Sequence, residues 1–466
     1  VGDQAEGEEA EVRDRALRLP ASESYCLESS ASGQLDKLHY RPTQRMAPPP
    51  GAIEIEVAAA GLNFRDVLNA MGLYPGGPIP VGKECSGYVS ALGVDVTDLE
   101  VGDAVLAVAP ASFARFAVTR ADLVVPKPAS LSFEEAATIP ITFLTAHYAL
   151  GHLARLEHGE RVLVHAGAGG VGLAAIQLAK RVGAEIFATA GSSEKRAFLA
   201  SLGVEHCMDS RSLKFADEIM EITGGRGVDV VLNSLPGEFI TRSLAVLGPY
   251  GRFVEIGRTD IYLNRQIGLL PFQNNLSYFA VDLEKLCRER SQRVRSLFDE
   301  LTQALAEGSL RPLPHQRFAA EEIVGAFRYM AQRRNIGKIV VSMRAPEATE
   351  TPTEPSGIRA DATYLVTGGC GGLGLAVARW LAERGARHLV LLGRSGAGEE
   401  AEPTLETLRQ EGVSVFVRRV DVADRRVLAE LLSEIRETLP PLRGVVHAAG
   451  VIEDGLLTRL ASELFR

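Results

Sequence analysis

Two glycine-rich turns are the features of this sequence whose residue types and spacing point most directly to chemistry. The first turn lies between an apolar run at 162–165 and a helical run at 173–181, and the second lies between similar runs at 363–366 and 375–384. Glycines let backbone N–H groups approach a pyrophosphate closely, and the start of a helix adds partial positive charge. We therefore predict a dinucleotide site at each turn. The alternative for the first turn is that its glycines serve packing alone.

The predicted cofactor contacts come from these loops and from the ends of neighbouring strands. The first loop supplies Gly167, Gly169, Gly170, Val171 and Gly172. The second site combines loop residues with residues at later strand ends: Gly368, Gly371, Gly372, Leu373, Gly374, Arg394, Ser395, Asp421, Val422, Ala448, Ala449 and Gly450. Two such signatures on one chain are stronger evidence than either signature alone.

The residues after the second strand of the first site favour NADPH over NADH. An NAD site would have Asp or Glu there to hold the ribose hydroxyls, whereas this chain has Ser192 and Lys195. Both side chains are able to bind a 2′-phosphate; the alternative is that Lys195 and Arg196 are solvated surface cations. Glu194 is interpreted as a charge at a helix start. In the second site, Arg394 at a strand end gives the same NADP-type arrangement.

Metal ligands are missing where a zinc reductase would need them. The segment 80–87 resembles the one that carries a ligand His before Glu in zinc alcohol dehydrogenases, but Lys83 stands at that position and no Cys lies near Asn63. We therefore predict hydride transfer without a metal. Three histidines spaced five and six residues apart are predicted not to share one helix face and to be packing or surface residues: His147, His152 and His158.

Composition excludes several classes of protein. The 466 residues carry 59 acidic and 50 basic side chains, a net charge of −9 that disfavours nucleic acid. Five cysteines without a C-x-x-C pair fit a reducing cytosol. The N-terminus is acidic, unlike a secretory signal, and no apolar run is interpreted as a membrane span. We expect a cytoplasmic protein.

The expected elements divide the chain into blocks. Residues 25–128 form a β-rich block broken by Pro and Gly, and strand-like and helical runs alternate from 134 to about 310. Such alternation is typical of βαβ units around a parallel sheet. Residues 345–361 are rich in Pro, Thr, Glu and Ala and have the composition of a linker. A second βαβ block follows it.

The motifs of residues 25–343 resemble those of zinc-free medium-chain reductases, specifically the enoylreductase domain of type I polyketide or fatty acid synthases. The phrases that carry this resemblance are Gly61-Leu-Asn-Phe-Arg-Asp66, Val164-His-Ala-Gly, Val231-Leu-Asn-Ser-Leu235 and Asn335-Ile-Gly-Lys-Ile-Val340. Residues 361–466 resemble the first half of the ketoreductase that follows it. The order of the two blocks along the chain is itself a specific signal of such a synthase.

This resemblance implies an α/β fold class. A GroES-like β-rich substrate domain and a Rossmann doubly wound parallel sheet form the medium-chain reductase, and a second, incomplete Rossmann fold follows. The implied boundaries are a linker at 1–20, the substrate domain at 21–133 and 311–344, the NADPH domain at 134–310, a linker at 345–360 and the ketoreductase part at 361–466.

The resemblance also implies roles for single residues. In the first site, NADPH contacts are implied for the glycine loop and for Ser192, Lys195, Arg211, Asn233 and Lys338, with Asn63 near the nicotinamide. The candidates for the acid that protonates the product are Tyr74, Arg258 and Asp282. Alternatively, Tyr74 is a turn residue packed on Pro75 and Asp282 is an ion-pair partner. Arginine hardly deprotonates, so Arg258 is better suited to orient substrate or stabilise an enolate.

The implied activity is NADPH-dependent reduction of a trans-2-enoyl thioester on the phosphopantetheine arm of an acyl carrier protein, with neighbouring synthase domains as further partners. Hydride reaches the β-carbon and a proton reaches the α-carbon. The alternative is a free-standing quinone or enone reductase with a non-catalytic C-terminal module. The ketoreductase Lys, Ser and Tyr would follow His447-Ala-Ala-Gly450, and this sequence ends at Arg466 before them. The segment is therefore expected to bind a cofactor without reducing ketones.

Overall fold

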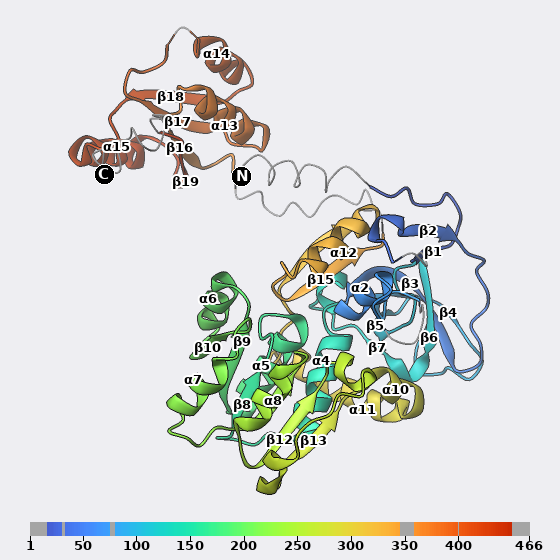
Figure 1. Cartoon of the computed structure of the whole chain (residues 1–466). Coiled ribbons are helices and arrows are strands. Elements are labelled where there is room, and N and C mark those ends of the chain that lie inside the picture. The colour runs from blue at the N-terminus through green and yellow to red at the C-terminus, as the bar shows by residue number, and fades with distance from the viewer. Residues whose placement is uncertain (1–15, 30–32, 75–79, 345–357, 399, 450–466) are drawn as a thin grey trace. The chain divides into compact units, whose positions relative to one another are not determined.

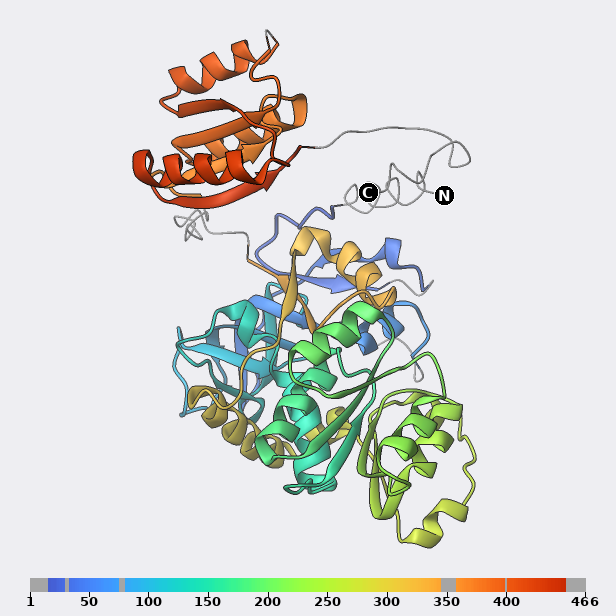
Figure 2. The same ribbon diagram turned by 90° about the vertical axis from the view of Figure 1, so that its left-hand side faces the viewer.

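The computed structural model describes residues 16–29, 33–74, 80–344, 358–398 and 400–449. The chain divides into two compact units, Val1–Ala345 and Pro346–Arg466. The first unit contains a parallel sheet and a mainly antiparallel sheet, and the second contains a parallel sheet (Figures 1 and 2).

The parallel sheet of the first unit has six strands in the order β10-β9-β8-β11-β12-β13. Its strands are β8 (Arg161–Val164), β9 (Glu185–Ala190), β10 (His206–Asp209), β11 (Val228–Asn233), β12 (Leu247–Glu255) and β13 (Ser277–Ala280). The helices around it are α4 (Pro140–His147), α5 (Gly170–Val182), α6 (Ser193–Ser201), α7 (Phe215–Ile222), α8 (Glu238–Ala245), α9 (Thr259–Tyr262), α10 (Leu283–Glu289) and α11 (Ser291–Ala306). All strand pairings in this sheet are parallel, as the alternating sequence pattern predicts.

The second sheet of this unit joins segments from both ends of the unit's sequence. Its strands are β3 (Ala52–Leu62), β4 (Glu84–Leu92), β5 (Ala104–Val108), β6 (Phe116–Arg120), β7 (Val124–Pro126), β14 (His315–Ala319) and β15 (Lys338–Ser342). Strand β15 pairs antiparallel with β3, and Figure 1 shows α12 (Ile323–Ala331) beside the N-terminal elements β1 (Tyr25–Glu28), β2 (His39–Pro42) and α2 (Phe64–Ala70). The pairing of β15 with β3 brings Lys338 to Asn63, which lies directly after β3.

The described residues of the first unit form four apolar cores, and two of them are much larger than the others. One packs α4, α5 and α11 against the parallel sheet, with Phe143 and Phe298 fully buried. The other fills the β-rich part around Phe113 and Phe327, whose rings meet edge to face. The first core also includes Leu106 of β5 and Val125 of β7, so it joins the parallel sheet to the β-rich part.

The second unit has four parallel strands in the order β18-β17-β16-β19. Its elements are β16 (Thr363–Thr367), α13 (Gly372–Glu383), β17 (His388–Gly393), α14 (Glu402–Gln410), β18 (Ser414–Arg419), α15 (Arg425–Thr438) and β19 (Leu442–His447). Figure 2 shows helices on both sides of this sheet. The predicted α/β fold class is therefore confirmed: a β-rich part and a doubly wound parallel sheet precede a second parallel sheet that has helices on both sides.

No helix within the described ranges combines the length and the apolar character that a membrane crossing requires. Part of the predicted N-terminal linker packs against the protein. Leu17 donates its backbone N–H to the carbonyl of Glu321 at 2.8 Å, and Leu17 and Leu19 lie against the core of the β-rich part.

Candidate functional site

The first glycine loop connects β8 to α5 and has no room for side chains where it turns. Ala166 adopts a φ of +51°, and a Cβ added to Gly172 would lie 2.5 Å from the carbonyl oxygen of Ala166. The loop and the first turn of α5 hold all five residues predicted here: Gly167, Gly169, Gly170, Val171 and Gly172. Because α5 is 13 residues long and starts at this loop, the loop fits a pyrophosphate.

Three cationic side chains lie around the end of β9, namely Lys195, Arg211 and Arg333. Ser192 caps α6 and accepts the backbone N–H of Lys195 at 3.3 Å. The Lys195 Nζ donates to the carbonyl of Arg333 at 2.6 Å. Burial lowers the pKa of Lys195, and the positive charges of Arg211 and Arg333 lower it further. A Cβ at Gly191 would lie 3.4 Å from the Arg211 Nε. These groups fit the 2′-phosphate of NADPH.

A buried polar network connects the glycine loop to the β-rich part. Lys338 pairs with Glu84 at 2.5 Å, and the two residues are 2% and 0% exposed. Lys338 also donates to the Asn63 Oδ1 at 2.7 Å, while the Asn63 Nδ2 donates to Glu84 at 2.8 Å. A Cβ at Gly170 would lie 3.5 Å from the Lys338 side chain. The predicted residues Asn63 and Lys338 therefore lie together, beside the predicted cofactor loop.

The three candidate acids belong to one cluster of polar side chains. Asp282 caps α10 and accepts the Lys285 backbone N–H at 3.0 Å, and its other oxygen pairs with Arg258 at 3.0 Å. Arg258 also donates to the hydroxyl of Tyr262 at 3.4 Å and lies over that ring. The Tyr262 ring meets the Tyr74 ring edge to face, with centroids 6.1 Å apart. The cluster is thus Tyr74, Tyr262, Arg258 and Asp282.

Arg65 covers the cluster from the side of α2. Its guanidinium lies 4.5 Å from the centre of the Tyr74 ring and pairs with Glu284 of α10. Burial raises the pKa of Tyr74, and the hydrogen bond with Tyr262 raises it further. The hydrogen bonds from Arg258 and Tyr74 lower the pKa of Tyr262. The two phenols therefore differ in acidity.

Asn233, the remaining residue predicted for the first site, is fully buried at the end of β11. Its Nδ2 donates to Glu255 at 2.6 Å and to the carbonyl of Leu235 at 2.9 Å. Glu255 also accepts the backbone N–H of Gly257 at 2.6 Å. Burial raises the pKa of Glu255 to about 7, although both hydrogen bonds oppose this rise. This contact ties the Rossmann strand end to the loop that carries Arg258.

The residues at the position of a catalytic zinc do not fit that metal. Lys83, which stands where a ligand His would be needed, pairs with Glu284 at 3.2 Å. Burial raises the pKa of Cys85 to about 12, which disfavours the thiolate that binds zinc. We derive no step through a metal at this place.

The prediction that His147, His152 and His158 do not share one helix face holds for His158, which lies outside the helix, but is wrong for the pair His147 and His152. Residues Tyr148–Leu153 form a π-helical turn, which brings residues five apart onto one face, and the two rings lie 5.2 Å apart. Together with Glu300 they form a group that could hold a metal ion. However, the His147 Nε2 already contacts Glu300 at 2.8 Å, and the Arg293 guanidinium contacts the His152 Nδ1 at 2.5 Å, which places a positive charge beside this group.

Treatment of the protein with EDTA is therefore expected to leave the reductase activity predicted from its sequence unchanged, because the described residues around Lys83 provide no zinc ligand set. The measurement is the NADPH oxidation rate before and after incubation with EDTA and gel filtration. A rate that falls and returns on addition of Zn²⁺ would contradict the metal-free assignment.

The second unit repeats the strand, glycine loop and helix arrangement. Gly368 has a φ of +65°, and a Cβ there would lie 2.5 Å from the carbonyl oxygen of Ala448. Gly371 caps α13, and Gly372, Leu373 and Gly374 form its first turn, with Leu373 exposed. The Ala449 N–H donates to the Thr367 Oγ1 at 3.3 Å.

The other residues predicted for this site follow parallel strands of the same sheet. Arg394 and Ser395 come directly after β17, and Asp421 and Val422 follow β18. The carboxyl ends of parallel strands meet at one edge of a sheet, so these residues share an edge with the glycine loop. Gly450 and the motif 451–454 lie outside the described residues.

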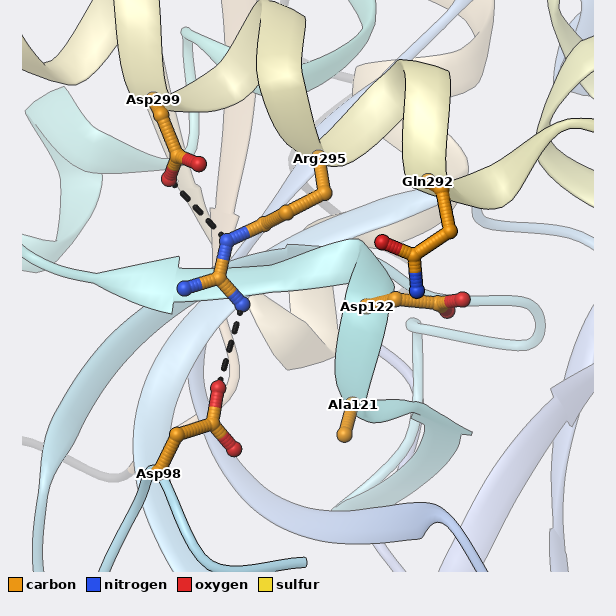
Figure 3. A pocket seen from close by; sticks show the side chains of 6 residues that line it. All are labelled: Asp98, Ala121, Asp122, Gln292, Arg295 and Asp299. Carbon is orange, nitrogen blue, oxygen red and sulfur yellow. Dashed lines mark hydrogen bonds and ion pairs between the residues drawn. The ribbon is translucent and has the colours of Figure 1, made fainter.

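A separate hollow of about 420 Å³ shares no residue with these sites (Figure 3). Arg295 of α11 reaches across it between Asp98, at 3.3 Å, and Asp299, at 3.0 Å. Both contacts are ion pairs at the surface, and we assign no reaction to this hollow.

Several residues of the candidate site were not predicted from the sequence. Glu84 follows Lys83 in a motif whose sequence signal concerns metal ligands, and Arg333 precedes the phrase that starts at Asn335. Tyr262 stands four residues after Arg258, a spacing at which side chains meet on a helix. That spacing was the available signal for Tyr262.

Known protein families match segments of both units. The sequence matches the families described as "Alcohol dehydrogenase GroES-like domain" over 49–129, "Zinc-binding dehydrogenase" over 202–341 and "KR domain" over 362–466. It is 42% identical to a phenolphthiocerol/phthiocerol polyketide synthase of Mycobacterium tuberculosis (strain ATCC 25618 / H37Rv) over 98% of this chain and 21% of that protein. The chain thus spans about a fifth of that relative.

Solved structures resemble the first unit. The CurK enoyl reductase crystal structure is 48% identical, covers 68% of this chain and 99% of its own, and gives a TM-score of 0.64. The mycobacterial protein Rv1454c in complex with NADPH is 26% identical over 68% of this chain and 99% of its own, with a TM-score of 0.62.

Proposed function

Since this chain belongs to the polyketide synthase family, with an enoyl-reductase-type oxidoreductase unit followed by a KR domain, we propose that its first unit reduces the trans-2-enoyl thioester on an acyl carrier protein. The product is the saturated acyl thioester, and the cofactor is NADPH. The proposed partners are the carrier protein with its phosphopantetheine arm and the neighbouring synthase domains.

The cluster of Tyr74, Tyr262, Arg258 and Asp282 is the observation that carries this proposal. Reduction of a conjugated thioester leaves an enolate whose α-carbon must receive a proton, and general-acid assistance raises the rate of that step. The Arg258–Asp282 pair and the two phenols supply a cation and hydroxyl donors within one cluster. Reduction of a quinone needs no protonation at carbon.

NADPH, when bound, supplies the hydride that the β-carbon receives. The backbone N–H groups of the loop around Gly169 and Gly170 hold its pyrophosphate, and Ser192, Lys195 and Arg211 bind the 2′-phosphate. Arg333 joins this group of cations. Asn233 orders the neighbouring strand end.

The network of Asn63, Lys338 and Glu84 fixes the boundary between the two sheets. Its hydrogen bonds hold the Asn63 amide in one orientation, close to the glycine loop. Among the three predicted acids, Arg258 retains its proton and stabilises the enolate oxygen, while Asp282 orients Arg258. Tyr74 contributes a phenol to the same cluster.

For the second unit, we propose a second NADPH site of the ketoreductase type. The proposed contact residues are the Gly368–Gly374 loop, Arg394, Ser395, Asp421, Val422, Ala448 and Ala449, together with Gly450, which lies outside the described residues. An alternative is a non-catalytic structural or cofactor-binding module that docks neighbouring domains.

A steady-state assay tests the proposed reaction. NADPH oxidation is followed with a crotonyl-pantetheine thioester and, separately, with a simple quinone at equal concentration. A higher kcat/KM for the thioester is expected, because the cluster protonates carbon. A higher kcat/KM for the quinone would favour the free-standing quinone reductase alternative and overturn the proposal.

A further inference from the structure

Each of the three acids predicted from the sequence is committed to another contact. The Asp282 carboxylate forms an ion pair with Arg258 and also accepts a hydrogen bond from the Lys285 N–H. Tyr74 lies half-buried between the Arg65 guanidinium, 4.5 Å from its ring centre, and the edge of the Tyr262 ring. The proton for the α-carbon therefore needs a more accessible donor.

Tyr262 is that accessible group. The residue is 47% exposed, and its hydroxyl lies 3.4 Å from the Arg258 guanidinium and hydrogen-bonds to the Tyr74 phenol. The position is fixed by α9, because the Tyr262 N–H donates to the carbonyl of Arg258 at 3.0 Å, one turn earlier. The backbone therefore sets the distance between this phenol and the cation.

We propose that Tyr262 donates the proton to the α-carbon and that Tyr74 is a positioning residue that holds the Tyr262 hydroxyl. This inference rests on the enoyl reduction proposed above. It differs from the sequence-based assignment, in which Tyr74 itself was the candidate phenol.

The proton transfer balances without a further reagent. The O–H bond of Tyr262 breaks, and the electron pair of the enolate forms the new C–H bond at the α-carbon. The phenolate that remains carries one negative charge, which the Arg258 guanidinium stabilises. Water then returns a proton to Tyr262 before the next turnover.

The charges that face the two phenols support this division of roles. Arg258, at the start of α9, and Tyr74, after α2, lower the pKa of Tyr262, while the Asp282 carboxylate at the start of α10 opposes this. Burial raises the pKa of Tyr74 against the charge of Arg65. Tyr262 is thus the more acidic phenol and leaves the more stable phenolate.

The test uses the full chain with NADPH and an α-methyl enoyl pantetheine thioester, and it compares kcat across pH for four proteins: wild type, Tyr262→Phe, Tyr74→Phe and Tyr250→Phe. Tyr250 is 71% exposed and lies outside the cluster, so Tyr250→Phe is the matched control. A donor must be protonated, so kcat falls as pH rises through its pKa.

The kcat of Tyr262→Phe is expected to be about 10²–10⁴-fold lower than that of wild type. It should also lack the alkaline limb of the pH profile, which is the fall of kcat as pH rises. Tyr74→Phe should keep the limb but move it to higher pH, because the phenolate of Tyr262 loses a hydrogen-bond donor. An ultraviolet titration of tyrosinate without cofactor gives a readout independent of activity: Tyr262→Phe should lack the phenol that ionises first. The control should match wild type.

The opposite pattern would overturn the inference. In that pattern Tyr74→Phe lacks the alkaline limb of the pH profile, whereas Tyr262→Phe keeps a kcat like that of wild type and shows the limb at lower pH. That result leaves the enoyl reductase proposal intact, because wild type still consumes NADPH with the thioester. A wild type that does not consume NADPH with the thioester would refute the proposed function and this inference together.

Discussion

Replacing Lys338 by methionine is expected to lower the free energy of unfolding of the first unit by about 3–5 kcal/mol. The reason is the buried pair that Lys338 forms with Glu84, in which both side chains are almost completely removed from water. Without the ammonium group, the Glu84 carboxylate stays buried without its counter-ion. The carbonyl of Leu62 and the Asn63 Oδ1 also lose a donor.

Urea denaturation of the full chain measures this effect, and the residue composition separates the two units. Trp380 is the one tryptophan of the sequence and lies in the second unit, whereas nine of the ten tyrosines precede Ala345. Near-ultraviolet circular dichroism of tyrosine therefore follows the first unit, and tryptophan fluorescence follows the second. Only the tyrosine transition should shift.

Two variants control this prediction. Lys37→Met removes an exposed lysine and should change the unfolding free energy by less than about 0.5 kcal/mol. The double variant Glu84→Gln with Lys338→Met should be less destabilised than Lys338→Met alone, since no unpaired charge remains. A loss below about 1 kcal/mol in Lys338→Met, which is what a surface pair contributes, would contradict the buried-pair account.

Lys195→Ala is expected to raise the KM for NADPH about tenfold to more than a hundredfold and to leave the KM for NADH almost unchanged. A charge-assisted hydrogen bond to a phosphate contributes about 1.5–3 kcal/mol, and NADH lacks the 2′-phosphate. Arg333→Ala should have the same selective effect, because its charge acts on Lys195 and lies in the same cluster of cations. Initial rates with the two cofactors measure this.

Arg181→Ala is the matched control, since this cation is exposed at the opposite end of α5 from the glycine loop. It should leave both KM values unchanged. An equal rise of both KM values in Lys195→Ala would contradict the phosphate contact. The role of Lys195 would then be structural, through its hydrogen bond to the carbonyl of Arg333.

The fold was predictable because its signals are local. The alternation of apolar runs and helical runs predicted strands at 162–165 and 186–189, and the structure has β8 at Arg161–Val164 and β9 at Glu185–Ala190. The glycines of both cofactor loops were recognisable because close backbone approach leaves no other residue type at positions such as Gly172.

The contacts within the site were less predictable because they join distant segments. Glu84 meets Lys338 only after β15 pairs with β3, and no local pattern reports that pairing. Tyr262 of α9 approaches Tyr74, which lies after α2, far earlier in the sequence. The contact of His147 with His152 depends on a π-helical turn, whereas an α-helical period would separate them.

Deuterium labelling tests most directly whether this chain transfers hydride from NADPH to an enoyl thioester. The full chain is incubated in H₂O with crotonyl-pantetheine and NADPH deuterated at C4, each C4 epimer in turn, and the butyryl product is examined by NMR. One epimer is expected to place one deuterium at the β-carbon and none at the α-carbon, and unlabelled NADPH in D₂O should reverse this pattern. Saturated product without cofactor deuterium at the β-carbon from either epimer, or no saturated thioester at all, would contradict the proposal that this chain reduces enoyl thioesters with NADPH.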